Sequence, residues 1–188
     1  MKTILPTPLI PLICAALMVC GCRQAKMERL AKTMMEHEII IPDSLKLLNE
    51  DFIDESAMLE TDGKYKLIVS IPKEQCTSCR VSAHELLDSL LCSTTLSVFV
   101  PMVILDQPDE TEIQTIKATI EKFRLEFPIY LDSSSGLFNL NPFIPDDEVF
   151  HSFLLDRSNR VVLIGDPTTD YNMMKLYQKV LADKFSSR

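Results

Sequence analysis

The stretch Cys76-Thr77-Ser78-Cys79 constrains this chain more than any other. It lies between an apolar, β-prone run, residues 65–71, and a segment with helical spacing, residues 80–91. Two cysteines separated by two residues can close a small disulfide ring, and the free N–H groups at a helix start favour a thiolate. In such motifs the first cysteine commonly has a pKa lowered from ~8.5 to roughly 3.5–7.5. The pattern predicts a redox-active pair at a strand–helix junction, and the alternative is a structural or vestigial disulfide at the helix start.

Composition excludes several function classes. The formal net charge is −8 and no long basic run occurs, which argues against nucleic-acid binding. Only 4 glycines are present, and none forms a Gly-rich phosphate loop. The length of 188 residues favours one globular domain.

The N-terminus has the pattern of a secretory signal peptide. Lys2 is followed by an apolar stretch, residues 4–19, that is too short and too proline-broken to span a membrane. It ends in Val19-Cys20-Gly21-Cys22, which resembles the bacterial lipobox. The resemblance implies cleavage after Gly21 and lipid on Cys22, so that acyl chains hold the protein on a membrane. The alternative is a plain secretory signal with incidental cysteines.

These patterns divide the chain into three parts. We expect a lipoprotein signal peptide over residues 1–21, a lipidated N-terminus and spacer helix over 22–37, and one folded domain over 38–188. The helix, 23–36, can either pack on the domain or act as a semi-flexible spacer. Export places Cys76, Cys79 and Cys92 outside the cytosol, where disulfides persist. Cys92 ends an apolar helical run and is expected to be buried.

Strands and helices are expected to alternate through the domain. The order favours a three-layer α/β fold with a mixed central sheet, closed by an antiparallel hairpin and a helix. Pro101 predicts a bulge or break in its strand. Predicted strands are residues 38–41, 64–71, 96–105, 128–132, 150–156 and 161–165, predicted helices are 79–91, 111–126 and 170–185, and 139–148 is a predicted loop.

Four stretches in this order resemble the thioredoxin-like superfamily, and more specifically the membrane-attached, periplasmic TlpA/ResA-like thiol–disulfide oxidoreductases. They are the strand leading into the CxxC motif, residues 67–79; the short strand Phe127-Pro128-Ile129-Tyr130-Leu131-Asp132; the hairpin Phe153 to Val162; and the final helix. Together they span residues 64–185, about two thirds of the chain.

The chain departs from that family at two positions. Gln75 stands where the family usually has a tryptophan. Phe150 stands where the family has a cis-proline that faces the CxxC. A cis bond before phenylalanine costs about 3 kcal/mol more than one before proline, so we expect a trans peptide there.

The resemblance implies a chemistry carried by two cysteines. Cys76 would attack a partner's disulfide and Cys79 would resolve the mixed disulfide. The surrounding loops would supply Gln75, Thr77, Ser78, Val149, Phe150 and His151. No diffusible cofactor and no metal ligand are assigned, because electrons would pass through partner proteins of the cell envelope by mixed disulfides. The expected location is the bacterial envelope, lipid-anchored to a membrane and facing the periplasm.

Two alternatives belong to other function classes. Cys76, Cys79 and His151 together would form a soft ligand set suited to Cu(I) or Zn, so the chain can instead be a non-catalytic lipoprotein that carries copper or binds proteins. For His151 itself, an ordinary core or surface histidine is favoured. A thiol peroxidase is disfavoured, because the residues before Cys76 lack the Pro-x-x-x-Thr-x-x-Cys pattern of peroxiredoxins.

Overall fold

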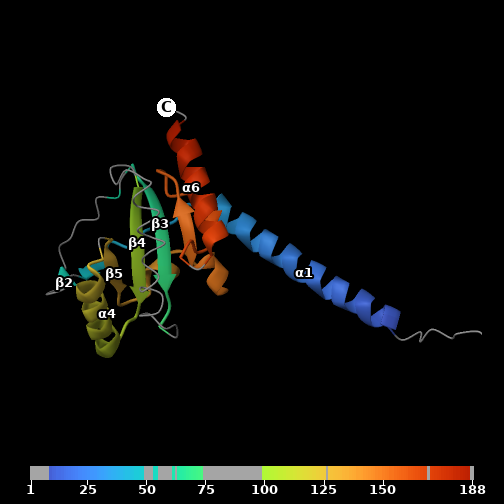
Figure 1. The fold of residues 1–188 in the computed structure, drawn as a ribbon, viewed down its shortest axis with the longest axis horizontal. Helices are drawn as coiled ribbons and strands as arrows, with labels where there is room; N and C mark the ends of the chain where they lie inside the picture. The colour runs from blue at the N-terminus through green and yellow to red at the C-terminus, as the bar shows by residue number, and fades with distance from the viewer. Residues whose placement is uncertain are drawn as a thin grey trace, which may run out of the picture.

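The computed structural model describes residues 9–48, 53–54, 61, 63–73, 99–125, 127–168 and 170–186 (Figure 1). Within these residues one seven-stranded sheet has the order β2-β1-β5-β4-β3-β6-β7. The strands are β1 (Lys46–Leu48), β2 (Ile53–Asp54), β3 (Tyr65–Ile71), β4 (Phe99–Asp106), β5 (Ile129–Asp132), β6 (Ser152–Leu155) and β7 (Val161–Ile164). The helices are α1 (Leu9–Glu36), α4 (Glu110–Phe123), α5 (Gly136–Leu140), the 3₁₀ turn η1 (Glu148–Phe150) and α6 (Tyr171–Ser186).

Three parallel strands form the centre of the sheet. β3 pairs with β4 from Tyr65↔Phe99 to Ile71↔Leu105, and β4 pairs with β5. The outer strands β1, β6 and β7 are antiparallel to their neighbours. Every residue of β3 is buried, because both faces of the sheet are covered. The predicted mixed α/β sheet with a closing hairpin and helix is confirmed.

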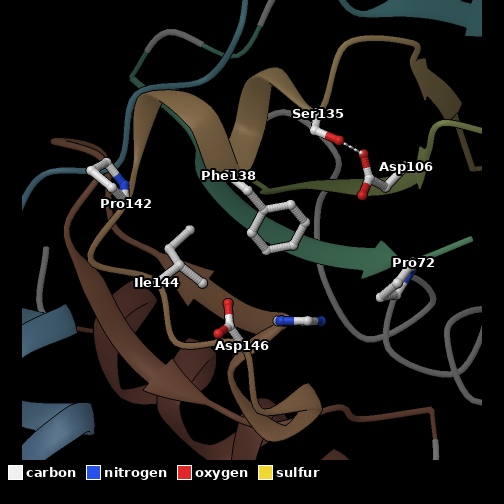
Figure 2. A pocket seen from close by; sticks show the side chains of 8 residues that line it. Pro72, Asp106, Ser135, Phe138, Pro142, Ile144 and Asp146 are labelled. Atoms are coloured by element: carbon white, nitrogen blue, oxygen red, sulfur yellow. Dashed lines mark hydrogen bonds between the residues drawn. The ribbon is translucent and has the colours of Figure 1, made fainter.

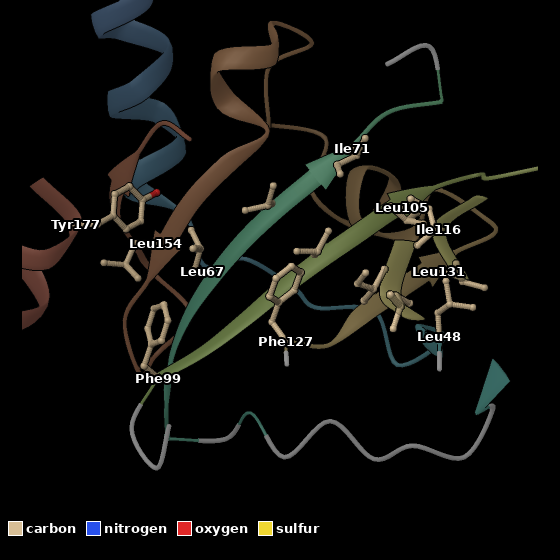
Figure 3. Close-up of a cluster of buried hydrophobic side chains, with 14 of the residues drawn as sticks. Leu48, Leu67, Ile71, Phe99, Leu105, Ile116, Phe127, Leu131, Leu154 and Tyr177 are labelled. Atoms are coloured by element: carbon tan, nitrogen blue, oxygen red, sulfur yellow. The ribbon is translucent and has the colours of Figure 1, made fainter. Parts of the chain in front are cut away.

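Alternation along β3 separates the core into two layers of side chains. Leu67 and Val69 pack on one face with Ile116 of α4 and Tyr177 of α6 (Figure 3). Ile68 belongs to the other cluster, which includes side chains from α1, α5 and η1. Helices therefore lie on both faces of the sheet, as in a three-layer fold.

The last turns of α1 belong to the folded domain. Met34 is fully buried, and Met27, Leu30 and Ala31 pack against the same cluster. The helix ends at Glu36, as predicted, and of the two alternatives for this segment the structure shows packing. Its N-terminal part points away from the sheet (Figure 1). No helix among the described residues is long and apolar enough to cross a membrane. The predicted boundaries at 21 and 37 stay predictions.

Pro101 is accommodated in β4 without a bulge, so that prediction is wrong. The register between β3 and β4 runs unbroken through Leu67↔Pro101. On the other side β5 begins at Ile129, opposite Val103, and the Val103 N–H points toward β5, donating to the Pro128 carbonyl at 3.4 Å. Residues 101 and 103 have the same orientation in the strand. The missing N–H of Pro101 therefore faces a position before β5 starts.

The structure differs from prediction in several short elements. Residues 38–41 form only an isolated bridge, Glu38↔Arg160, and not a strand. β1 and β2 lie where the sequence shows no regular pattern. The predicted loop 139–148 begins inside α5. The predicted strand 150–156 starts later, at Ser152, because η1 occupies the residues before it.

Candidate active site

The predicted redox pair lies outside the described residues. Gln75, Cys76, Thr77, Ser78 and Cys79 all fall in residues 74–98, as do His84, Cys92 and the predicted helix. Their roles stay predictions. The structure does describe the point from which this segment departs, since β3 ends at Ile71 and Pro72 follows. Cys76 is four residues beyond Pro72, and an extended chain of that length spans about 14 Å at most.

The predicted active-site loop, Val149-Phe150-His151, is described completely. Val149 and Phe150 belong to η1, whose N-cap Asp147 accepts a hydrogen bond from the Val149 N–H at 3.2 Å. Val149 is 53 % exposed, whereas Phe150 is 1 % exposed and lies in the core. No cis peptide bond occurs among the described residues, so the expected trans peptide before Phe150 is confirmed.

His151 is a buried side chain in contact with the sheet. It is 8 % exposed, and its carbonyl accepts a hydrogen bond from the Ser70 N–H of β3 at 2.9 Å. Its Nε2 lies 3.2 Å from the Pro145 carbonyl, and its ring is tilted against Phe138 with centroids 4.9 Å apart. Because a carbonyl can only accept, Nε2 carries the proton in this hydrogen bond. Nδ1 is buried and has no hydrogen-bond partner among the described residues.

Burial controls the protonation of this imidazole. Desolvation lowers the pKa of His151, because a charged ring is costly away from water. The Pro145 carbonyl and the carboxylates of Glu148, Asp146 and Asp147 oppose this effect and raise the pKa, but burial is the larger influence. Burial therefore favours the neutral form of His151, and with the proton on Nε2 this form has a lone pair on Nδ1.

A cavity of about 330 Å³ lies at the carboxyl ends of the parallel strands. Pro72 follows β3, Asp106 ends β4, and Ser135 comes three residues after the end of β5. In open α/β sheets ligands bind at this end. Figure 2 shows the side chains that line it; they are Pro72, Asp106, Ser135, Phe138, Pro142, Ile144, Asp146 and His151.

Hydrogen bonds fix the polar wall of this cavity. Ser135 Oγ donates to Asp106 at 2.6 Å and accepts from Gln107 Nε2 at 2.7 Å. At the end of β5, Asp132 accepts from the N–H groups of Gly136 and Leu137, both at 2.8 Å. Asp132 thereby holds the first turn of α5, the helix that presents Phe138.

Of the described residues that line the cavity, the sequence predicted His151 alone as a site residue. Asp106, Ser135 and Asp146 were missed, although Asp106 stands directly after an apolar strand run, a position that marks the carboxyl edge of a parallel sheet. His151 and Pro72 thus line the same cavity, and Pro72 lies four residues before Cys76 in the sequence. The predicted proximity of His151 to Cys76 and Cys79 stays a prediction.

Cys22 lies within α1, but its side chain is not among those described, and its lipidation stays a prediction. No group of three or more His, Cys, Asp or Glu side chains in the described part of the chain could hold a metal ion. Cys76 and Cys79 do not belong to that part of the chain.

Comparison with known proteins identifies the fold. The bacterioferritin comigratory protein of Xanthomonas campestris, a structure concerned with alkyl peroxide reduction, superposes with a TM-score of 0.53 at 13% identity, covering 78% of this chain and 97% of its own. A putative electron transfer protein from Aquifex aeolicus superposes at 0.50 with 14% identity, covering 77% and 97%. The fold is thioredoxin-like. The chain spans nearly the whole of both relatives.

The comparisons show this fold and leave the chain's place within it as a proposal. A thioredoxin domain of a thiol-disulfide oxidoreductase from Bacteroides vulgatus aligns with 16% identity over 65% of this chain and 82% of its own, at a TM-score of only 0.48. Neither the protein-family profiles nor the curated protein sequences give a match.

Proposed function

We propose that this chain is a lipid-anchored thiol–disulfide oxidoreductase of the bacterial cell envelope, related to the TlpA/ResA-like group. One observation carries the proposal: β3 of a thioredoxin-like sheet leads directly toward the CxxC motif at the carboxyl edge of the sheet. Cys76 follows four residues after Pro72, which lines the cavity. Cys22 would carry the lipid, and the domain would face the periplasm.

The proposed reaction needs no group beyond the two cysteines and a partner. The Cys76 thiolate attacks one sulfur of a partner disulfide, and the other partner sulfur leaves as a thiolate. The Cys79 thiolate then attacks the Cys76 sulfur and releases the partner's second thiol. Two electrons pass to the partner, and the Cys76–Cys79 disulfide forms. The reverse sequence oxidises a partner dithiol, so the direction depends on the reduction potential of the pair.

A turnover assay tests this proposal. The full chain, purified in a mild detergent, is given a fluorescent disulfide substrate and a reductant. We expect turnover that Cys76→Ser abolishes, whereas Cys79→Ser accumulates a mixed disulfide on Cys76. Cys92→Ser is the matched control and should retain the wild-type rate. Equal rates in the wild type and the Cys76→Ser variant would contradict the proposal.

One observation favours the alternative of a copper-carrying lipoprotein: His151 Nδ1 has no hydrogen-bond partner in the part of the chain that the structure describes. A lone pair on a neutral imidazole is a good ligand for a soft metal beside thiolates. One Cu(I) per chain, lost in His151→Gln, together with absence of disulfide exchange, would favour this alternative over the oxidoreductase.

The same cysteine variants can be used to test for peroxidase activity. Counted back from Cys79 instead of Cys76, Pro72 takes the proline position of the peroxiredoxin pattern, and Cys76 stands where that pattern has threonine. Consumption of hydrogen peroxide that requires Cys79 and not Cys76 would favour a peroxidase.

A further inference from the structure

The polar wall of the cavity consists of hydrogen-bond acceptors. Asp106 and Asp146 contribute carboxylates, and Ser135 already uses its proton in the bond to Asp106. The only ring N–H of neutral His151 is directed to Pro145, which leaves the Nδ1 lone pair. The described lining residues therefore offer negative charge and lone pairs, with no unused side-chain donor.

The rim next to this wall is also acidic. Asp146, Asp147 and Glu148 follow one another and are all exposed. All three lie close enough to act electrostatically on His151. No ion pair involves these three carboxylates within the described part of the chain. Lys73, which follows Pro72, is exposed and is not one of the lining residues.

The remaining lining residues are apolar. Phe138, Pro142 and Ile144 stand beside the polar groups, and Figure 2 shows the ring of Phe138 in view between the Asp106–Ser135 pair and Asp146. An aromatic face attracts a cation as well as alkyl groups. The volume of about 330 Å³ is at the lower end of the range for small-ligand pockets, which suits one side chain better than a large cofactor.

We propose that this cavity binds the lysine or arginine side chain of a partner protein, its alkyl stem against Phe138, Pro142 and Ile144 and its cationic head among the acceptors. The carboxylates of Asp106 and Asp146 supply the charge complementarity, and the acidic rim attracts the surrounding basic segment. The cavity would select partners that carry a basic residue near the reacting cysteine, and this consequence for catalysis rests on the proposed function. Binding itself does not depend on redox activity.

The test separates binding from exchange. Short peptides that contain serine in place of cysteine and differ at one position, lysine, norleucine or glutamate, are titrated into the full chain by calorimetry. We expect the lysine peptide to bind roughly tenfold more tightly than the norleucine peptide at low salt, and the difference to shrink at high salt. Asp146→Asn and Asp106→Asn should each reduce the preference by several fold, because the amide keeps the shape and removes the charge.

Glu121→Gln is the matched control. Glu121 is an exposed carboxylate on α4, whose buried side chains lie in the core cluster on the other face of the sheet from Ile144. This variant should keep the full preference for lysine. Butylammonium chloride serves as a free-amine probe, and it should bind more weakly than the lysine peptide.

Each outcome decides a separate point. Equal affinity for the lysine and norleucine peptides, or a preference that Asp146→Asn and Glu121→Gln reduce equally, overturns this inference. If butylammonium binds more tightly than the lysine peptide, the inference that the cavity binds a protein partner is overturned. With disulfide-bonded versions of the peptides, equal exchange of all three leaves the proposed function standing and removes the selectivity. If the lysine peptide binds preferentially but no disulfide exchange occurs, the binding inference stands and the proposed function is contradicted.

Discussion

His151 shows how one buried side chain can link this site to pH. Its folded-state pKa is lowered by burial below the unfolded value of about 6.5. At pH values between the two pKa values, the unfolded chain therefore binds more protons than the folded chain. The contribution of neutral His151 to the stability of the fold is fully present above the unfolded pKa. That contribution is lost as the pH falls through the folded-state pKa.

The stability of the protein should therefore depend on pH through His151. We expect the unfolding free energy of the wild type to fall between pH 7.5 and pH 5 by more than that of His151→Gln, as measured by urea denaturation. His37→Gln is the control, because His37 is exposed. An identical pH dependence for wild type and His151→Gln would contradict the assigned role of burial.

Asp132 is the residue that holds one wall of the cavity in place. It is 1 % exposed and accepts two backbone hydrogen bonds at the start of α5. Removing a buried, charged acceptor leaves both N–H groups without a partner. Asp132→Ala should lower the unfolding free energy by about 2–4 kcal/mol.

The comparison for that variant is Asp109→Ala. Asp109 caps α4 in a capping box with Glu112, on the surface, and its loss should cost about 1 kcal/mol. Urea denaturation measures both variants. A cost for Asp132→Ala no greater than that for Asp109→Ala would show that the buried cap does not hold α5.

At the scale of elements, the long apolar runs could be predicted and the short elements could not. β3, β4 and the hairpin are rich in buried apolar residues, and their pattern is visible in the sequence. β1 has three residues and exists because it pairs with β5, a contact that local sequence does not encode. α5 has five residues and depends on a carboxylate from the preceding strand.

For the site too, local motifs could be predicted from the sequence, whereas residues that come together only in the fold could not. The cysteines and the loop around His151 stand out along the sequence because they form local motifs. Asp106, Ser135 and Asp146 come together only because parallel strands end at one edge of the sheet and a proline-rich loop returns to it. That convergence is a property of the topology.

Two adjacent methionines of α1 allow a test of whether this helix packs on the core. Met34 is fully buried in the core cluster, whereas Met35 is 42% exposed. Met34→Ala should lower the unfolding free energy by about 2–5 kcal/mol, because it leaves a cavity in the core. Met35→Ala should change it by about 0.5 kcal/mol or less. Equal effects, measured by urea denaturation, would show that the helix does not pack as described.

At the scale of the whole molecule, this thioredoxin-like sheet places a cavity, an acidic rim and the start of the CxxC segment at one edge. One face of the same sheet is covered by the last turns of α1, the helix that also contains Cys22, the residue proposed to carry lipid. Under the proposed function, a redox domain would be held near a membrane, and its partners would approach the carboxyl edge of the sheet. The proposed function requires that Cys76 and Cys79 form a working dithiol.

A redox titration of Cys76 and Cys79 tests this requirement. The protein is equilibrated in graded thiol–disulfide buffers, free thiols are trapped by alkylation, and the adducts are mapped by mass spectrometry. The account predicts a single two-electron transition of Cys76 and Cys79 above about −300 mV, with Cys92 taking no part in it. A pair that stays oxidised below about −300 mV, or that never forms a disulfide, would contradict the account.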